Sequence, residues 1–143
     1  LAADWVRRRL ADGWPVLLLL GQHFGDGDPW RQTLERLDLA GYSRDELLGA
    51  LDAAAGHMGA RCVIAVDAVN EGAGARLWRS RINGFARAVT QFRNLGLLLT
   101  CRSEYEDIVL AEMTPDALSF ENQPNLVSTH CTKNCAARVE TAR

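Results

Sequence analysis

An acidic and amide cluster follows one strongly apolar run of the chain. Cys62–Val66 is wholly apolar and ends at Asp67, and Asn70 and Glu71 come three and four residues later. An apolar run of this length is typical of a strand buried on both faces of a parallel sheet. Open α/β sheets bind ligands beyond the carboxyl ends of their strands. The pattern therefore predicts a ligand site that begins at Asp67.

The two carboxylates suit metal-assisted hydrolysis of a phosphate ester. Asp67 is a hard oxygen ligand at the end of a rigid element, able to hold magnesium through water. Glu71 could orient or deprotonate a hydrolytic water close to a γ-phosphate. The alternative for Asp67 is a plain strand terminator. For a lone aspartate that alternative is the better one, whereas the full string up to Glu71 favours function.

A second set of candidates ends the next apolar run, Leu95–Cys101. Arg102 follows this run, so it is expected at the same sheet edge as Asp67. Its guanidinium could stabilise charge on a γ-phosphate. The alternative is a surface arginine paired with Glu104 or Glu106, and the sequence does not decide between them. Thr100 could hydrogen-bond water or phosphate, or be an ordinary strand residue.

One part of a nucleotide site is missing from the sequence. Of the 16 basic residues, 15 are arginine, and the only lysine is Lys133. A phosphate loop needs Gly-x-x-x-x-Gly-Lys-Ser/Thr after a strand, and no such string is present. The glycine-rich stretch Gly21–Gly27 has two nearby acids, Asp26 and Asp28, which repel phosphate. It is better interpreted as a flexible strand-to-helix loop, with His23 as a weak candidate.

Composition bounds the class of protein. A chain of 143 residues can bury one real core, and the net charge of −2 gives no bulk attraction to nucleic acid or membrane. No wholly apolar stretch is longer than five residues, the length of Val16–Leu20, which is too short to span a bilayer. The start does not resemble a signal peptide. We expect a cytoplasmic protein. Because Leu1 is not a methionine, we also expect a fragment or processed product.

Metal binding through cysteine is not expected. Cys131 and Cys135 lie close together in the sequence with His130 beside them. A zinc site would need a second ligand pair, and none is visible.

Alternating strand and helix patterns predict the fold. Three apolar runs, Val16–Leu20, Cys62–Val66 and Leu95–Cys101, are separated by helical patterns. The clearest helix carries apolar residues spaced four and three apart, at Trp78, Ile82, Phe85, Val89 and Phe92. Such alternation is typical of βαβ units. We predict an α/β fold, a three-layer parallel sheet with flanking helices, over residues 1–113. Residues 114–143 lack a sustained period and are predicted to be irregular or disordered.

These strings resemble those of one family. Val63–Gly72 resembles the Walker B segment of STAND-class NTPases, the NACHT-like branch of the AAA+ and related P-loop ATPases. Leu97–Ser103 is similar to the sensor-1 strand of that family. The large bacterial antiviral STAND proteins of the Avs type share strings like Leu77–Arg79 and Cys101–Glu106. The resemblance covers approximately residues 1–110 and does not include a Walker A segment.

The resemblance implies a role for each site residue. Asp67 would be the magnesium-associated acid, and Asn70 and Thr100 would complete the nucleotide-binding edge. Glu71 would activate water, and Arg102 would be the sensor arginine. The three predicted strands would be the second, third and fourth of a partial P-loop core. The first strand, with the phosphate loop, would precede Leu1.

The function implied is that of an ATPase switch. The full protein would bind and hydrolyse ATP with Mg²⁺, self-associate on sensing a viral trigger protein, and act in antiviral defence. These 143 residues alone are predicted to be inactive, because the phosphate cradle is missing. No membrane partner and no specific nucleic acid are expected. A non-catalytic α/β interaction domain, or a product with a scrambled end, remain alternatives.

Overall fold

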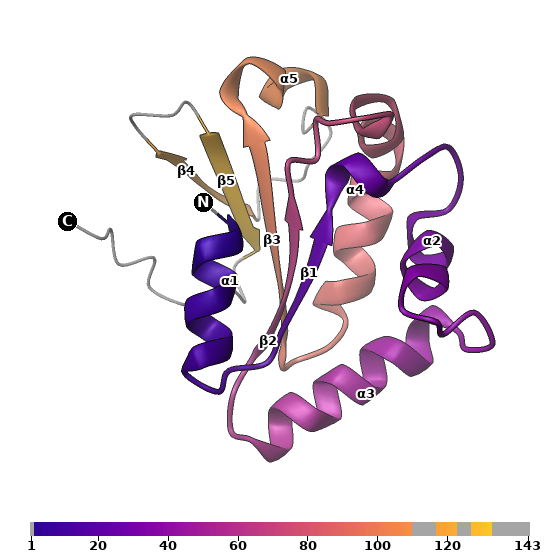
Figure 1. The fold of residues 1–143 in the computed structure, drawn as a ribbon, viewed down its shortest axis with the longest axis vertical. Coiled ribbons are helices and arrows are strands. Elements are labelled where there is room, and N and C mark those ends of the chain that lie inside the picture. The colour runs from indigo at the N-terminus through magenta and orange to yellow at the C-terminus, as the bar shows by residue number, and fades with distance from the viewer. Residues whose placement is uncertain (1, 110–116, 123–126, 133–143) are drawn as a thin grey trace.

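The computed structural model describes residues 2–109, 117–122 and 127–132. In these residues Figure 1 shows one twisted sheet with helices packed against it. The sheet has the strand order β1-β2-β3-β5-β4. Its strands are β1 (Val16–Leu20), β2 (Cys62–Asp67), β3 (Leu95–Arg102), β4 (Ala117–Asn122) and β5 (Val127–Thr132). The first three are parallel, whereas β5 runs antiparallel to both β3 and β4.

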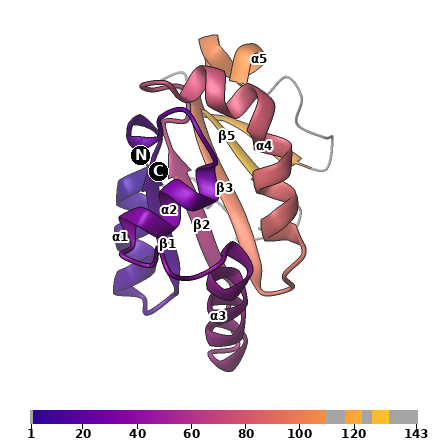
Figure 2. The same ribbon diagram turned by 90° about the vertical axis from the view of Figure 1, so that its right-hand side faces the viewer.

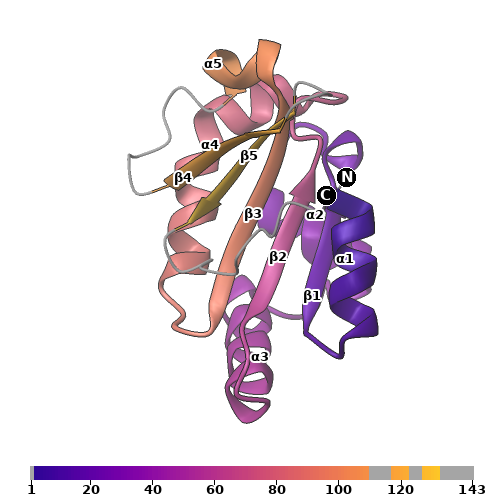
Figure 3. The same cartoon turned by 90° about the vertical axis from the view of Figure 1, so that its left-hand side faces the viewer.

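Helices cover both faces of the sheet. They are α1 (Ala2–Ala11), α2 (Pro29–Arg36), α3 (Arg44–His57), α4 (Gly74–Thr90) and α5 (Glu106–Val109), with the 3-10 helices η1 (Gly21–His23) and η2 (Ser103–Tyr105). Helix α1 lies on one face, and α2, α3 and α4 lie on the other (Figures 2 and 3). The predicted α/β fold, with a parallel sheet of three strands flanked by helices, is therefore confirmed.

Strand β2 is the centre of the core, because both of its faces are covered. Val63 and Ala65 pack with Val6 of α1, whereas Ile64 and Val66 pack in the larger cluster below α2, α3 and α4. Residues 62–66 are all buried, as the wholly apolar run predicts. Each side chain alternates with the next across the sheet, so Asp67 continues the α1 side of β2.

Two helices begin with side-chain caps. Asp28 accepts a hydrogen bond from the backbone N–H of Arg31 at 2.8 Å, ahead of Pro29 at the first position of α2. Ser43 and Glu46 form a reciprocal capping box at the start of α3. The pKa of Glu46 is lowered mainly by the hydrogen bond that the Ser43 backbone N–H donates to its carboxylate. The hydrogen bond from the Ser43 hydroxyl lowers it further.

Helix α4 closes the larger core with its predicted stripe. Trp78, Ile82, Phe85 and Val89 are buried, and Phe92 packs against them. Trp78 contacts the rings of Phe24 and Phe85 edge to face, with ring centroids 5.1 Å apart in both pairs. This packing holds α4 against the sheet. Because α4 connects β2 to β3, it also holds the connection between these two strands.

The chain after residue 113 departs from the prediction. The expectation of an irregular or disordered segment is wrong for Ala117–Asn122 and Val127–Thr132, which pair as strands. Strand β5 supplies backbone partners to the outer edge of β3, and such pairing of backbone groups does not require an apolar period. The rest of that prediction falls on 114–116, 123–126 and 133–143, outside the described residues, and so does Lys133.

No helix in the described residues is long and apolar enough to cross a membrane.

Candidate functional site

Two neighbouring strand ends form the candidate site, at the top of the sheet in Figure 1. Val66 of β2 pairs with Leu99 of β3, so Asp67 lies beside Thr100. The Thr100 hydroxyl donates to Asp67 Oδ1 at 2.5 Å and accepts from the backbone N–H of Ala68 at 2.8 Å. Thr100 is buried and Asp67 is half-buried. Because a hydroxyl has one proton to donate, Thr100 positions the Asp67 carboxylate and has no proton left for a phosphate.

Two further hydrogen bonds connect the turn after β2 to β3. The backbone N–H of Val69 donates to the Thr100 carbonyl at 2.9 Å. The backbone N–H of Arg102 donates to Asn70 Oδ1 at 3.1 Å. The structure thus places Asp67, Asn70, Thr100 and Arg102 at one edge of the sheet, as the sequence predicts.

The turn that carries Glu71 has an unfavourable backbone conformation at Ala68. Ala68 has a φ of 55°, a left-handed conformation that costs a residue with a Cβ about 1–2 kcal/mol. The Ala68 carbonyl accepts from the backbone N–H of Glu71 at 3.0 Å, which closes the turn. Glu71 is half-buried, and no hydrogen bond or ion pair of its carboxylate is found in the described residues. Strain of this kind concentrates at functional sites.

Gly21 supports this turn from the side of β1. An added Cβ at Gly21 would lie 2.1 Å from the Ala68 carbonyl oxygen, so only glycine fits. At Gly72, where φ is +62°, an added Cβ would lie 3.2 Å from the Gln22 carbonyl oxygen. The predicted flexible loop therefore begins as η1, packed against the turn. The sequence interpretation missed this role, although a glycine directly after an apolar strand is a usable signal. His23 is exposed and its carbonyl accepts from Arg36.

Arg102 is exposed at the end of β3. In the described part of the chain, ion pairs join Arg7 to Asp4, Arg31 to Glu35 and Arg44 to Asp45. Arg102 takes part in none of these, so the alternative of an Arg102–Glu104 pair is not supported. The Glu106 side chain lies outside what the structure describes.

The donor set bears on which metal could bind here. Among the described residues, no group of three or more His, Cys, Asp and Glu side chains comes together. Asp67 therefore offers one carboxylate, with Oδ1 already accepting from Thr100. A preformed zinc or calcium cage does not match this set.

Comparison with known proteins does not identify a family. No family model matches the chain, and no curated protein and no solved structure is significantly similar to it.

Removing the Thr100 hydroxyl should loosen the site. We expect Thr100→Val to lower the free energy of unfolding by about 1–3 kcal/mol, because the Ala68 N–H and Asp67 Oδ1 lose their partner. Thr100→Ser keeps the hydroxyl and is the matched control. Urea unfolding of the three proteins measures the difference. Equal midpoints for Thr100→Val and the wild type would show that this hydroxyl does not support the turn.

Proposed function

We propose that the ends of β2 and β3 form part of the ATP–magnesium site of a STAND-class P-loop nucleotide hydrolase. The observation that carries the proposal is the network centred on Thr100, which holds a strand-end carboxylate beside Asn70 and the start of the Arg102 turn. In such a hydrolase an acid at this place is associated with magnesium, and the next acid positions the attacking water.

The chemistry of Asp67 fits magnesium delivered with a nucleotide. Magnesium usually keeps several waters and is bound by one or two carboxylates together with substrate phosphates. Asp67 supplies one carboxylate, held through Oδ1 by Thr100, and this carboxylate would hold a hydrated ion. The bound ion would neutralise charge on the phosphates. Holding the carboxylate in one rotamer is the contribution of the protein.

Glu71 and Arg102 would have different roles in hydrolysis, one toward the attacking water and the other toward the γ-phosphate. Glu71 follows on the turn and has the carboxylate needed to accept a proton from water. The Arg102 guanidinium is exposed at the adjoining strand end and could stabilise negative charge on the γ-phosphate. Asn70 would hold these two elements in register through its bond to the Arg102 N–H.

Turnover requires a phosphate cradle that the sequence does not contain. We therefore propose that these 143 residues alone do not hydrolyse ATP. In a protein that supplies the cradle, hydrolysis would drive self-association in the cytoplasm on recognition of a viral trigger, as the family resemblance implies.

Weak binding of magnesium–ATP to the isolated chain tests the site. We expect amide resonances of residues 67–71 and 100–102 to shift on titration of ¹⁵N-labelled protein. A dissociation constant on the order of 1 mM is expected because the backbone cradle is missing. Asp67→Ala and Arg102→Ala should reduce these shifts, whereas Arg7→Ala on α1 should not.

The same titration separates the alternative. Shifts elsewhere in the chain with none at the two strand ends, or equal titration of Asp67→Ala and wild type, would contradict a nucleotide site. A non-catalytic α/β interaction domain would then be the better description.

A further inference from the structure

Helix α4 and the turn after it carry a concentration of positive charge. From Gly72 to Cys101 the sequence has five arginines and no Asp or Glu. All five are exposed, at positions Arg76, Arg79, Arg81, Arg87 and Arg93. The opposite, apolar side of α4 is buried against the sheet. We call these five residues the α4 arginine face.

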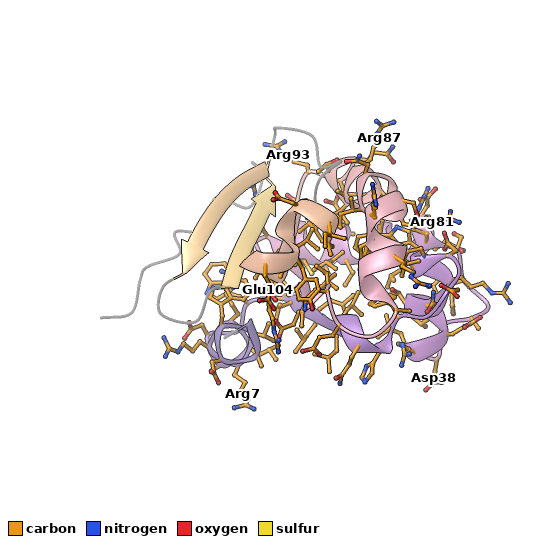
Figure 4. The ribbon with its side chains drawn as sticks, turned by 90° about the horizontal axis from the view of Figure 1, so that it is seen from above. Arg7, Asp38, Arg81, Arg87, Arg93 and Glu104 are labelled. Carbon is orange, nitrogen blue, oxygen red and sulfur yellow. The ribbon has the colours of Figure 1, made fainter. Side chains whose placement is uncertain are left out.

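The arginines are spread over the exposed surface of α4 and of the turn after it. Arg76 and Arg87 are 11 residues apart, three turns and about 16 Å along the same side of the helix. Figure 4 shows Arg81, Arg87 and Arg93 extending outward around α4, whereas Arg7 lies on α1 at the opposite side. Within the part of the chain that the structure describes, no carboxylate neutralises the charge of the α4 arginine face through an ion pair.

The start of α4 has no acidic side chain, whereas α1, α2 and α3 each have one at the cap or in the first turn. Its cap residue, Ala73, makes no side-chain cap hydrogen bond, and its first turn has no acid. Arg76, the third residue of α4, instead lies near the positive end of the helix dipole, which is unfavourable. By contrast, α3 has Asp45 and Glu46 in its first turn. A local rule broken without internal compensation points to a functional surface, and a bound anion would offset the cost.

We propose that the α4 arginine face binds the phosphate backbone of double-stranded DNA. Guanidinium groups match phosphate oxygens in bidentate geometry. The major groove of B-form DNA admits an α-helix, whereas the deep, narrow major groove of an RNA duplex does not. Phosphate contacts carry no sequence information, so the binding is not sequence specific.

Other polyanions fit this face less well. Single strands are held by stacking on aromatic side chains, and the exposed aromatics Trp14 and Tyr42 lie outside α4. A membrane-bound helix inserts apolar residues, but Trp78, Ile82 and Phe85 are buried. A tight acidic protein partner needs apolar anchors near the centre of the interface, and none is exposed between these arginines.

Charge reversal tests this surface separately from the proposed nucleotide site, because none of its residues belongs to that site. Fluorescence anisotropy of a labelled DNA duplex at low salt would compare wild type with Arg79→Glu/Arg87→Glu. We expect the affinity to fall at least about tenfold and the salt slope to decrease by about 2. The control Arg7→Glu/Arg8→Glu makes the same change in net charge on α1, and its affinity should stay within about threefold of wild type.

Every other outcome overturns the proposal. These outcomes are an absence of wild-type binding at low salt, an equal loss in the α1 control, and equal affinity for an RNA duplex, polyglutamate or anionic phospholipid vesicles. Circular dichroism checks that each variant is folded. Should Arg79→Glu/Arg87→Glu not fold, Arg79→Gln/Arg87→Gln replaces it. Unchanged DNA affinity in that variant would also contradict the proposal.

Discussion

Gly21→Ala is expected to lower the free energy of unfolding by about 3 kcal/mol and to shift the amide resonances of residues 67–72. The added Cβ would lie 2.1 Å from the Ala68 carbonyl oxygen and 2.9 Å from the Val69 Cα. Both are backbone atoms, so no side-chain rotation relieves the overlap. Overpacking of a closely packed site typically costs 1–3 kcal/mol and sometimes more, about the loss expected here. Either η1 or the turn that carries Glu71 must move.

Gly41→Ala is the matched control for this substitution. No heavy atom lies within 4 Å of the Cβ position at Gly41, and its φ is not left-handed. Its free energy of unfolding should stay within about 0.5 kcal/mol of the wild type. Denaturant unfolding and an amide shift map of both variants make the comparison. If Gly21→Ala leaves the turn resonances unchanged, η1 does not support the site.

Trp78→Ala is expected to lower the free energy of unfolding by about 3–5 kcal/mol, enough to unfold a domain of marginal stability. Trp78 is fully buried and contacts Phe24 and Phe85 through its ring faces and edges. Its indole N–H has no hydrogen-bond partner in the described residues. The loss is therefore one of apolar packing and of ring contacts, not of a hydrogen bond.

Trp14→Ala provides the comparison at a partly open position. Trp14 is 41% exposed, and its ring contacts the Arg9 guanidinium, an interaction of about 0.5–1 kcal/mol at such a site. Thermal unfolding followed by far-UV circular dichroism would rank the two variants. Similar melting temperatures for Trp78→Ala and Trp14→Ala would show that α4 does not close the core as described.

Much of the parallel core could be predicted because its signals are local. The capping box of Ser43 and Glu46 and the stripe from Trp78 to Val89 each specify a helix within a few residues. Likewise, parallel strands bring their carboxyl ends to one edge. That rule alone places Asp67 and Arg102 at the same end of the sheet, as observed.

The details of the site could not be predicted because they depend on register between distant segments. The sequence places Thr100 near the end of β3, but only the pairing of Val66 with Leu99 puts its hydroxyl beside Asp67. The contact of Gly21 with Ala68 similarly joins residues far apart in the chain. The pairing of β5 with β3 is equally non-local, and no apolar period in 114–143 signals it.

ATP turnover is the decisive measurement for a nucleotide site at the ends of β2 and β3. The measurement uses Asp67→Ala and Glu71→Ala in a longer protein that joins this chain to a phosphate-binding segment, with Glu104→Ala as the control. We predict that each site variant lowers turnover at least about a hundredfold, since metal positioning and water activation each contribute at least that much. The control should keep the wild-type rate. Wild-type turnover in both site variants would contradict a nucleotide site at the ends of β2 and β3.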